Sequence, residues 1–186
     1  MPRVSLQLLL ALALGLAFSY YWEPRTDSGA DQRTSERRKE LPQTYLYTTR
    51  SWAYNEEGTL ANILEADWAR HYSHADHTLM RAPRFYAHNK DDRSWSAAAY
   101  WGKFKHELKQ LVLKNDVYLS HDQSGARLDT TEMVINVETR IASSWKPVTI
   151  TQGLNRTDAE AMMANLEDET IVLAPNVEST YVHPPE

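Results

Sequence analysis

The chain has 186 residues, a formal net charge of −5 and 42% hydrophobic residues, which is enough for one domain with one core. It contains no cysteine, which excludes disulfides, thiolate metal sites, a cysteine nucleophile and a lipid-modified N-terminal cysteine. The acidic balance also disfavours nucleic-acid binding through charge alone.

The first predicted element is a membrane-spanning helix over residues 1–22. No residue from Val4 to Trp22 is charged, and 19 residues at ~1.5 Å each span roughly 28 Å, close to the ~30 Å core of a bilayer. The run ends in three aromatic residues, which suit the headgroup level. A cleaved signal peptide is the alternative. However, one possible cleavage site would leave too short an apolar core, and the other would place bulky aromatic residues directly after the cleaved bond. A buried core helix is disfavoured because the run is apolar on every side.

Residues 23–40 predict a charged, flexible linker. Ten of these 18 residues are charged, and Pro24 and Gly29 oppose helix formation. Arg3 favours a cytoplasmic N-terminus, but more arginines and a lysine follow the apolar run. The residues alone therefore leave the orientation open.

Residues 41–186 predict a folded domain of about ten β-strands. Apolar and polar residues alternate, and turn residues recur every 8 to 14 positions, which is typical of an all-β sandwich, roll or barrel. Along 60–72 the pattern places Leu60, Leu64, Ala66, Trp68 and Tyr72 on one side of an extended strand. The predicted strands are Thr44–Thr49, Leu60–Tyr72, Arg84–His88, Trp95–Trp101, Leu111–Ser120, Leu128–Thr139, Pro147–Thr151 and Glu169–Val182.

Two short segments, Gly102–Leu108 and Asp158–Leu166, have helical propensity but are short enough for context to make them strands. A faint repeat relates residues 112–117 to residues 172–177, sixty positions later. It fits two copies of one strand–turn–strand unit, or a chance likeness between valine-rich strands.

The histidines of the His-x2-His-x2-His stretch are the only candidate metal ligands. His71, His74 and His77 stand beside Asp76, and a metal would need two or three of the imidazoles to converge. The stretch lies between two predicted strands, so a polar loop is favoured. The sequence predicts no metal and no cofactor.

No pattern indicates catalysis. Ser143 and Ser144 lack the flanking glycines of a hydrolase nucleophile, and no glycine-rich phosphate loop exists. The pairs Glu56–Glu57 and Asp91–Asp92 read as turn residues and not as a paired acid and base. We therefore expect that the protein is not an enzyme.

A series of segments, in order and spacing, carries a resemblance to a known family. They are Tyr54–Leu60, His71–Tyr72, Ala82–Phe85, Arg93–Ala97, Leu111–Val117, Leu128–Thr131, Pro147–Thr149, Gly153–Leu154 and Asn176–Tyr181. The series resembles the LptC family of lipopolysaccharide export proteins over essentially the whole chain. Two departures are Asn115, where a loop glycine is common, and Asp158–Leu166, which lacks a usual glycine.

The resemblance implies a twisted β-jellyroll (OstA/LptA-like) in the periplasm, anchored in the inner membrane by one helix with its N-terminus in the cytoplasm. It implies lipopolysaccharide transport from the LptB, LptF and LptG ABC transporter to the bridge protein LptA. The edge at Thr44–Arg50 would meet the transporter, and the edge at Glu169–Val182 would meet LptA. The interface residues expected from this are Thr44, Thr49, Gly58, Gly153 and Val177.

A lipid with several acyl chains needs an apolar trough, because exposing each CH2 to water costs roughly 0.8 kcal/mol. For each residue taken alone, an ordinary core position is the favoured interpretation. The expected inward-facing lining is Leu60, Leu64, Ala66, Met80, Trp95, Leu111, Leu113, Ile171, Leu173 and Tyr181. The alternatives are an anchored adaptor that binds no lipid, and an anchored hydrolase.

Overall fold

The computed structural model describes residues 41–89 and 92–182. The predicted helix at 1–22, the predicted linker at 23–40 and Asp91 of the predicted turn lie outside the described residues. Among those described, no helix is long and apolar enough to cross a membrane. They form fourteen strands: β1 (Thr44–Tyr54), β2 (Leu60–Tyr72), β3 (His77–Arg81), β4 (Arg84–Asn89), β5 (Asp92–Ala98), β6 (Trp101–Lys105), β7 (Gln110–His121), β8 (Arg127–Asn136), β9 (Ile141–Ser144), β10 (Val148–Gln152), β11 (Asn155–Ala159), β12 (Met162–Asn165), β13 (Thr170–Leu173) and β14 (Glu178–Thr180).

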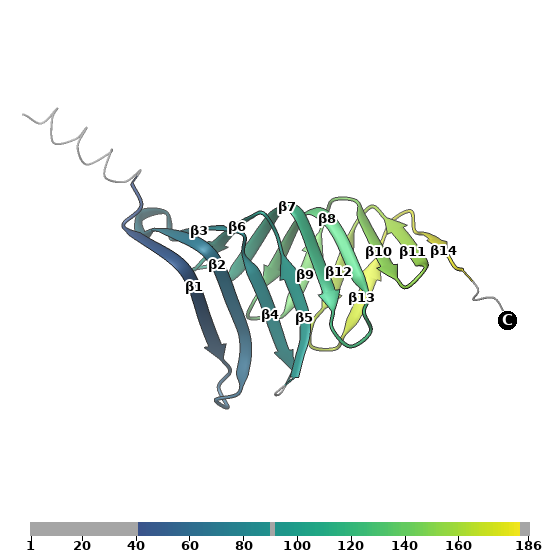
Figure 1. Ribbon diagram of the computed structural model, residues 1–186, viewed down its shortest axis with the longest axis horizontal. Coiled ribbons are helices and arrows are strands. Elements are labelled where there is room, and N and C mark those ends of the chain that lie inside the picture. The colour runs from purple at the N-terminus through teal and green to yellow at the C-terminus, as the bar shows by residue number, and fades with distance from the viewer. Residues whose placement is uncertain (1–40, 90–91, 183–186) are drawn as a thin grey trace, which may run out of the picture. The chain divides into compact units, whose positions relative to one another are not determined.

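The antiparallel strands form two layers that share the long strands β2, β7 and β8 (Figure 1). Layer 1 runs from the C-terminal half of β2 through β3, β6, β7, β8, β9 and β12 to β13. Layer 2 runs from the N-terminal half of β2 through β4, β5, β7, β8, β10 and β11 to β14. Strand β1 pairs with β2 along its length, so the all-β prediction is confirmed.

The shared strands turn from one layer into the other at a corner. In β7 the corner is a bulge at Asn115 and Asp116, whose φ angles are 63° and 51°, in the left-handed region. In β1 it falls at Thr48, with φ 51°. Asparagine and aspartate tolerate this conformation better than most residues, so Asn115 can replace a glycine here.

The corner shifts the alternation of β2, which corrects the prediction for Trp68 and Tyr72. Leu64 and Ala66 face the interior, but the next inward residue is Ala69, which is 5% exposed. Trp68 therefore lies on the outer surface, where its ring meets that of Trp101 at 5.6 Å. A prediction that assumes regular alternation of inward and outward side chains along the whole strand misses this shift.

Several boundaries also differ from the predicted ones. The two segments with helical propensity are strands, β6 and β11–β12, because each pairs with neighbours on both sides. The strand predicted to reach Thr139 ends at Asn136, whose side-chain Oδ1 accepts the backbone N–H groups of Glu138 and Thr139. The predicted strand at 169–182 is two strands, β13 and β14, which lie in different layers.

The two repeated segments occupy equivalent places in the fold. Residues 112–117 carry β7 from layer 1 to layer 2, and residues 172–177 connect β13 of layer 1 to β14 of layer 2. Both contain an asparagine with positive φ, 63° at Asn115 and 50° at Asn176. The faint repeat therefore matches a structural one, a strand broken at a corner.

Gly102 makes a close contact between layer 1 and the chain before β4. A Cβ atom at Gly102 would lie 2.8 Å from Cγ of Pro83, which is fully buried. We expect Gly102→Ala to lower the free energy of unfolding by about 1–3 kcal/mol, measured by urea denaturation. The penalty should shrink in a Pro83→Ala background, and an equal penalty in both backgrounds would contradict a clash with Pro83.

Candidate functional site

The candidate site is the interior between the two layers. The inner residues of layer 1 follow the paired positions His71, Thr78, Phe104, Leu111, Ile135, Ala142, Ala164 and Ile171. Those of layer 2 follow Leu64, Phe85, Ala97, Leu119 and Leu128. Successive strands thus line the interior with a nearly continuous apolar surface.

The middle of this interior is filled by side chains. Leu111, Leu113, Leu119, Met133 and Ile135 are each 0% exposed. Close packing of this kind leaves no room for a ligand without movement. The expected partly open trough is therefore closed at the level of β7 and β8.

An apolar cavity of about 370 Å³ lies at the N-terminal end, between β1, β2, β3, β4 and β6. Its apolar walls include Leu64, Met80, Phe85 and Phe104. Exposed residues of β1 also line it, so the cavity opens to solvent on the β1 side. Its volume lies within the range of ~300–1,000 Å³ that is usual for ligand pockets.

One end of the cavity is polar. The hydroxyl of Thr78 lies 2.8 Å from Nε2 of His106 and 3.1 Å from Nδ1 of His71, and Thr78 and His106 line the cavity. His71 lies in β2, within the predicted strand, and His74 lies in the connecting turn η1 (Ser73–Ala75). The loop prediction is wrong for His77, which belongs to β3. Among the described residues no group has the arrangement of a metal site.

Burial lowers the pKa of His106 below its ordinary value of 6.5; the charge of Asp76 opposes this, and nearby His71 and Lys109 reinforce it. The unfolded chain therefore binds more protons in the window just below pH 6.5, so this contribution to stability is complete above 6.5 and is lost as pH falls. We expect His106→Gln to flatten the pH dependence of the unfolding free energy between about pH 7 and pH 5. An unchanged slope in urea denaturation across that range would contradict this.

The ends of the layers away from the corner carry turns, and the gap between these two rows of turns is called the seam here. Two polar contacts cross it. Nη2 of Arg140, in the β8–β9 turn, donates to the carbonyl oxygen of His88 at the end of β4. Nε2 of His121, at the end of β7, lies 3.3 Å from Oε2 of Glu169 in the β12–β13 turn.

Buried polar atoms without a protein hydrogen-bond partner gather beside these contacts. Among the described residues they are Nδ1 of His88, Oγ of Ser94 and Nε1 of Trp95, whereas Nε2 of His121 has the ion-pair contact with Glu169 but no hydrogen bond. The rings of Trp95 and His121 meet at 4.7 Å. Unpaired buried groups of this kind raise the free energy of the closed seam, so they lower the cost of opening it to water or ligand.

The ten residues predicted to line a trough fall into different places. Leu64 and Met80 line the cavity, whereas Ala66, Trp95, Leu111 and Leu113 belong to the packed core. Ile171 and Leu173 are half-buried against that core, and Leu60 is half-buried at the start of β2. Tyr181 follows β14 at the C-terminal end of the described residues and is 71% exposed.

Sequence reasoning missed several cavity residues. Ala69 was missed because of the phase change in β2, and Phe104 because its segment was taken as ambiguous. Phe85 lies in a strand that was predicted correctly and had a usable signal, an aromatic residue two positions after the proline that precedes β4.

The predicted interface residues lie at edges and turns. Among residues 41–89 and 92–182, Thr44 and Thr49 lie on β1, which pairs with β2 alone, and the exposed Val177 precedes β14, which pairs with β11 alone. Gly58 and Gly153 have φ angles of 80° and 60°, and no atom of the residues that the structure describes lies within 4 Å of their Cβ positions. They serve the turn conformation and not a close backbone approach.

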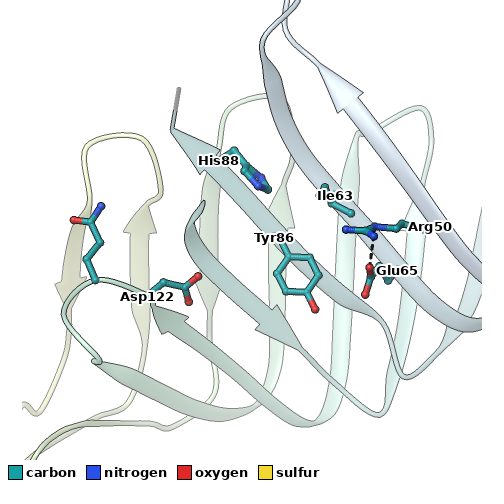
Figure 2. Close-up of a pocket in the computed structure, with 7 residues that line it drawn as sticks. Arg50, Ile63, Glu65, Tyr86, His88 and Asp122 are labelled. Atoms are coloured by element: carbon teal, nitrogen blue, oxygen red, sulfur yellow. Dashed lines mark ion pairs between the residues drawn. The ribbon is translucent and has the colours of Figure 1, made fainter. Parts of the chain in front are cut away.

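A larger hollow of about 730 Å³ lies on the outer surface of layer 2 (Figure 2). Nε of Arg50 and Oε1 of Glu65 pair there at 3.0 Å, beside Tyr86, His88 and Asp122. Its polar walls suit acyl chains poorly. It lies back to back with the apolar cavity, because neighbouring residues of β1, β2 and β4 point to opposite faces.

Comparison with known proteins gives one family match. The family described as "Lipopolysaccharide-assembly, LptC-related" matches residues 8–182. No curated relative matches by sequence. A similar solved structure is LptH from Pseudomonas aeruginosa, described as the LptA-homologous periplasmic component of its lipopolysaccharide transport device. It has a TM-score of 0.48 and 8% identity, covering 78% of this chain and 98% of that chain.

Proposed function

The chain belongs to the LptC-related family of lipopolysaccharide-assembly proteins and acts in lipopolysaccharide transport, and we propose that its β-domain takes acyl chains into the cavity beside β1. The observation that carries this is an apolar cavity that opens at the N-terminal edge of the domain. Each CH2 group sheltered there saves roughly 0.8 kcal/mol of exposure to water. In this proposal the domain transports the lipid and catalyses no reaction.

The lipid would then move along the interior toward β13 and β14. The filled middle blocks this path while the seam is closed, so passage requires the layers to part. Among the described residues, the polar contacts that would separate at the turns are those of Arg140 with His88 and of His121 with Glu169. The sugar and phosphate groups would stay in water outside the seam.

The two ends of the domain would bind different partners. Within the described part of the chain, the outer edge of β1 has no strand beside it and β14 pairs on one side only, so each can extend a neighbouring sheet by β-augmentation. We assign the β1 edge to the periplasmic domains of LptF and LptG, and the β13–β14 end to LptA.

The domain would be periplasmic and held at the inner membrane. The support is the uncharged run from Val4 to Trp22, long enough to span a bilayer. The orientation with the N-terminus in the cytoplasm is part of the proposal. The family description, lipopolysaccharide assembly, fits that location.

Adjacent residues Phe85 and Tyr86 provide a matched test, because Phe85 lines the cavity and Tyr86 lines the outer hollow. Benzoylphenylalanine at Phe85 should form lipopolysaccharide adducts when the transporter hydrolyses ATP, and at Tyr86 it should form few. The adducts are read with an antibody to lipopolysaccharide after irradiation of cells. An adaptor that binds no lipid would give no adduct at either position, and similar yields at both would contradict lipid in the cavity.

A further inference from the structure

The basic side chains on the outer surfaces of the two layers differ in whether they form ion pairs. On layer 2, Arg84, Arg127 and Arg156 each lie within 3.3 Å of a carboxylate oxygen. These pairs, which join two strands at Arg84 and lie within one strand at Arg127 and Arg156, compensate their charges within the face. Such pairs are usual on a solvated sheet surface.

On the outer surface of layer 1, four of five cations have no such partner. Among the described residues, Arg70, Arg81, Lys103 and Lys105 have no carboxylate oxygen within 4.0 Å, and only Lys114 pairs, with Glu132 at 3.2 Å. The chain as a whole carries −5. An acidic protein thus concentrates uncompensated positive charge on one face.

Aromatic rings lie beneath the arginines of this face. The guanidinium of Arg70 lies 4.5 Å from the ring centre of Trp68. That of Arg81 lies 3.1 Å from the ring centre of Tyr100 and 5.0 Å from that of Trp101. Trp101 and Tyr100 are themselves exposed. The arginines are held by ring contacts, which leaves their hydrogen-bond donors available to an outside anion.

A groove of about 560 Å³ runs beside these rings. Leu79, Val112 and Val134 supply apolar walls, and the register alternates Leu79 with Lys103 and then Val112 across β3, β6 and β7. Lys105 lines the same groove. Apolar surface thus lies directly beside ammonium groups.

We propose that this cationic face, made of Arg70, Arg81, Lys103, Lys105 and Lys114 with Trp68, Tyr100 and Trp101, docks on a bilayer surface that carries anionic lipid. Lysine and arginine bind anionic headgroups, and tryptophan and tyrosine favour the boundary between headgroups and acyl chains. The acidic remainder of the domain would be repelled by the same surface, which fixes the orientation of docking.

The position of the face along the chain fits this partner. Strand β1 begins at Thr44, and its exposed Tyr45 continues the aromatic set, with the guanidinium of Arg70 at 5.5 Å from its ring centre. Residues 23–40 can span at most roughly 60 Å when extended. The argument from the position along the chain rests on the proposed membrane anchor at residues 1–22. The argument from the charges and aromatic rings of the face does not depend on that anchor.

The test uses the full chain in nanodiscs, with one introduced cysteine in a chain that has none. A fluorophore on Gln110→Cys, which lines the groove, is compared with one on Thr151→Cys, on the outer face of layer 2. With phosphatidylglycerol present, headgroup-placed quenchers should quench the Gln110 probe and spare the Thr151 probe. Quenching should fall with added salt and in phosphatidylcholine alone.

A triple variant, Arg81→Gln with Lys103→Gln and Lys105→Gln, should lower the ratio of docked to free domain about 100-fold, at about fivefold per cation. The matched control neutralises Arg84, Arg127 and Arg156 and should leave quenching unchanged.

Equal quenching of both probes, or quenching that does not depend on lipid charge and salt, would overturn the proposal. Shielding of the Gln110 probe only after the transporter is added would make this a protein interface instead. Adducts at Phe85 do not depend on this face, so the two proposals fail separately.

Discussion

Ser51→Glu is expected to reduce lipopolysaccharide adducts at Phe85 at least about tenfold. Ser51 lies on β1, lines the cavity and is exposed, so the empty domain should fold with a hydrated carboxylate there. An acyl chain in the cavity would remove water from that carboxylate, and burial of an unpaired charge costs several kcal/mol, where 1.36 kcal/mol is already a factor of ten.

The readout is the adduct yield of benzoylphenylalanine at Phe85 in cells. Thr131→Glu is the matched control, because Thr131 is exposed on β8 outside the cavity and the charge change is the same. Ala53→Glu, at a second exposed lining position, should repeat the loss. An equal loss in the control would point to net charge or folding, and no loss at Ser51 would place the acyl chains elsewhere.

Local alternation was enough to predict where most of the core lies. Leu111 and Leu113 were expected to face inward, and both are 0% exposed. The strand after Pro83 was also predicted, and β4 begins at Arg84. Both predictions are confirmed, because a strand buried on one face imposes a period of two on its sequence.

Alternation could not locate the corners. The inward positions of β2 pass from Ala66 to Ala69, and neither residue differs in kind from its neighbours. A corner is set by the distance between the two layers and by the register of the partner strand, which are tertiary properties. For the same reason Trp68, predicted inward, contributes to the outer cationic face instead.

The extent of the cavity also could not be predicted from the sequence. Leu64 and Leu113 are both leucines on inner faces, yet one lines a cavity and the other is fully packed. The difference arises because β1 and β2 form the last pair at the N-terminal edge, so the interior there is bounded by few strands. Open space follows from how many elements meet at a point and not from residue type.

Leu113→Ala should have the largest effect on stability, a loss of about 2–5 kcal/mol in the free energy of unfolding. Leu113 is 0% exposed on β7, at the level where the two layers close on each other. The cost combines lost burial with the cavity that remains, because the surrounding strands are fixed by pairing on both sides. Leu154→Ala is the matched control, since Leu154 is 75% exposed in the β10–β11 turn and should change stability by less than about 0.5 kcal/mol.

Urea denaturation of both variants would measure this difference, with the slope m checked for two-state behaviour. Because passage requires the packed middle to part, Leu113→Ala should also leave loading at Phe85 intact while easing movement beyond it. Adducts should then rise at a probe on Ile171, half-buried at the far end of the same inner ladder. A stability loss as small as that of Leu154→Ala would mean that the middle is loosely packed, and the need for an opening seam would disappear.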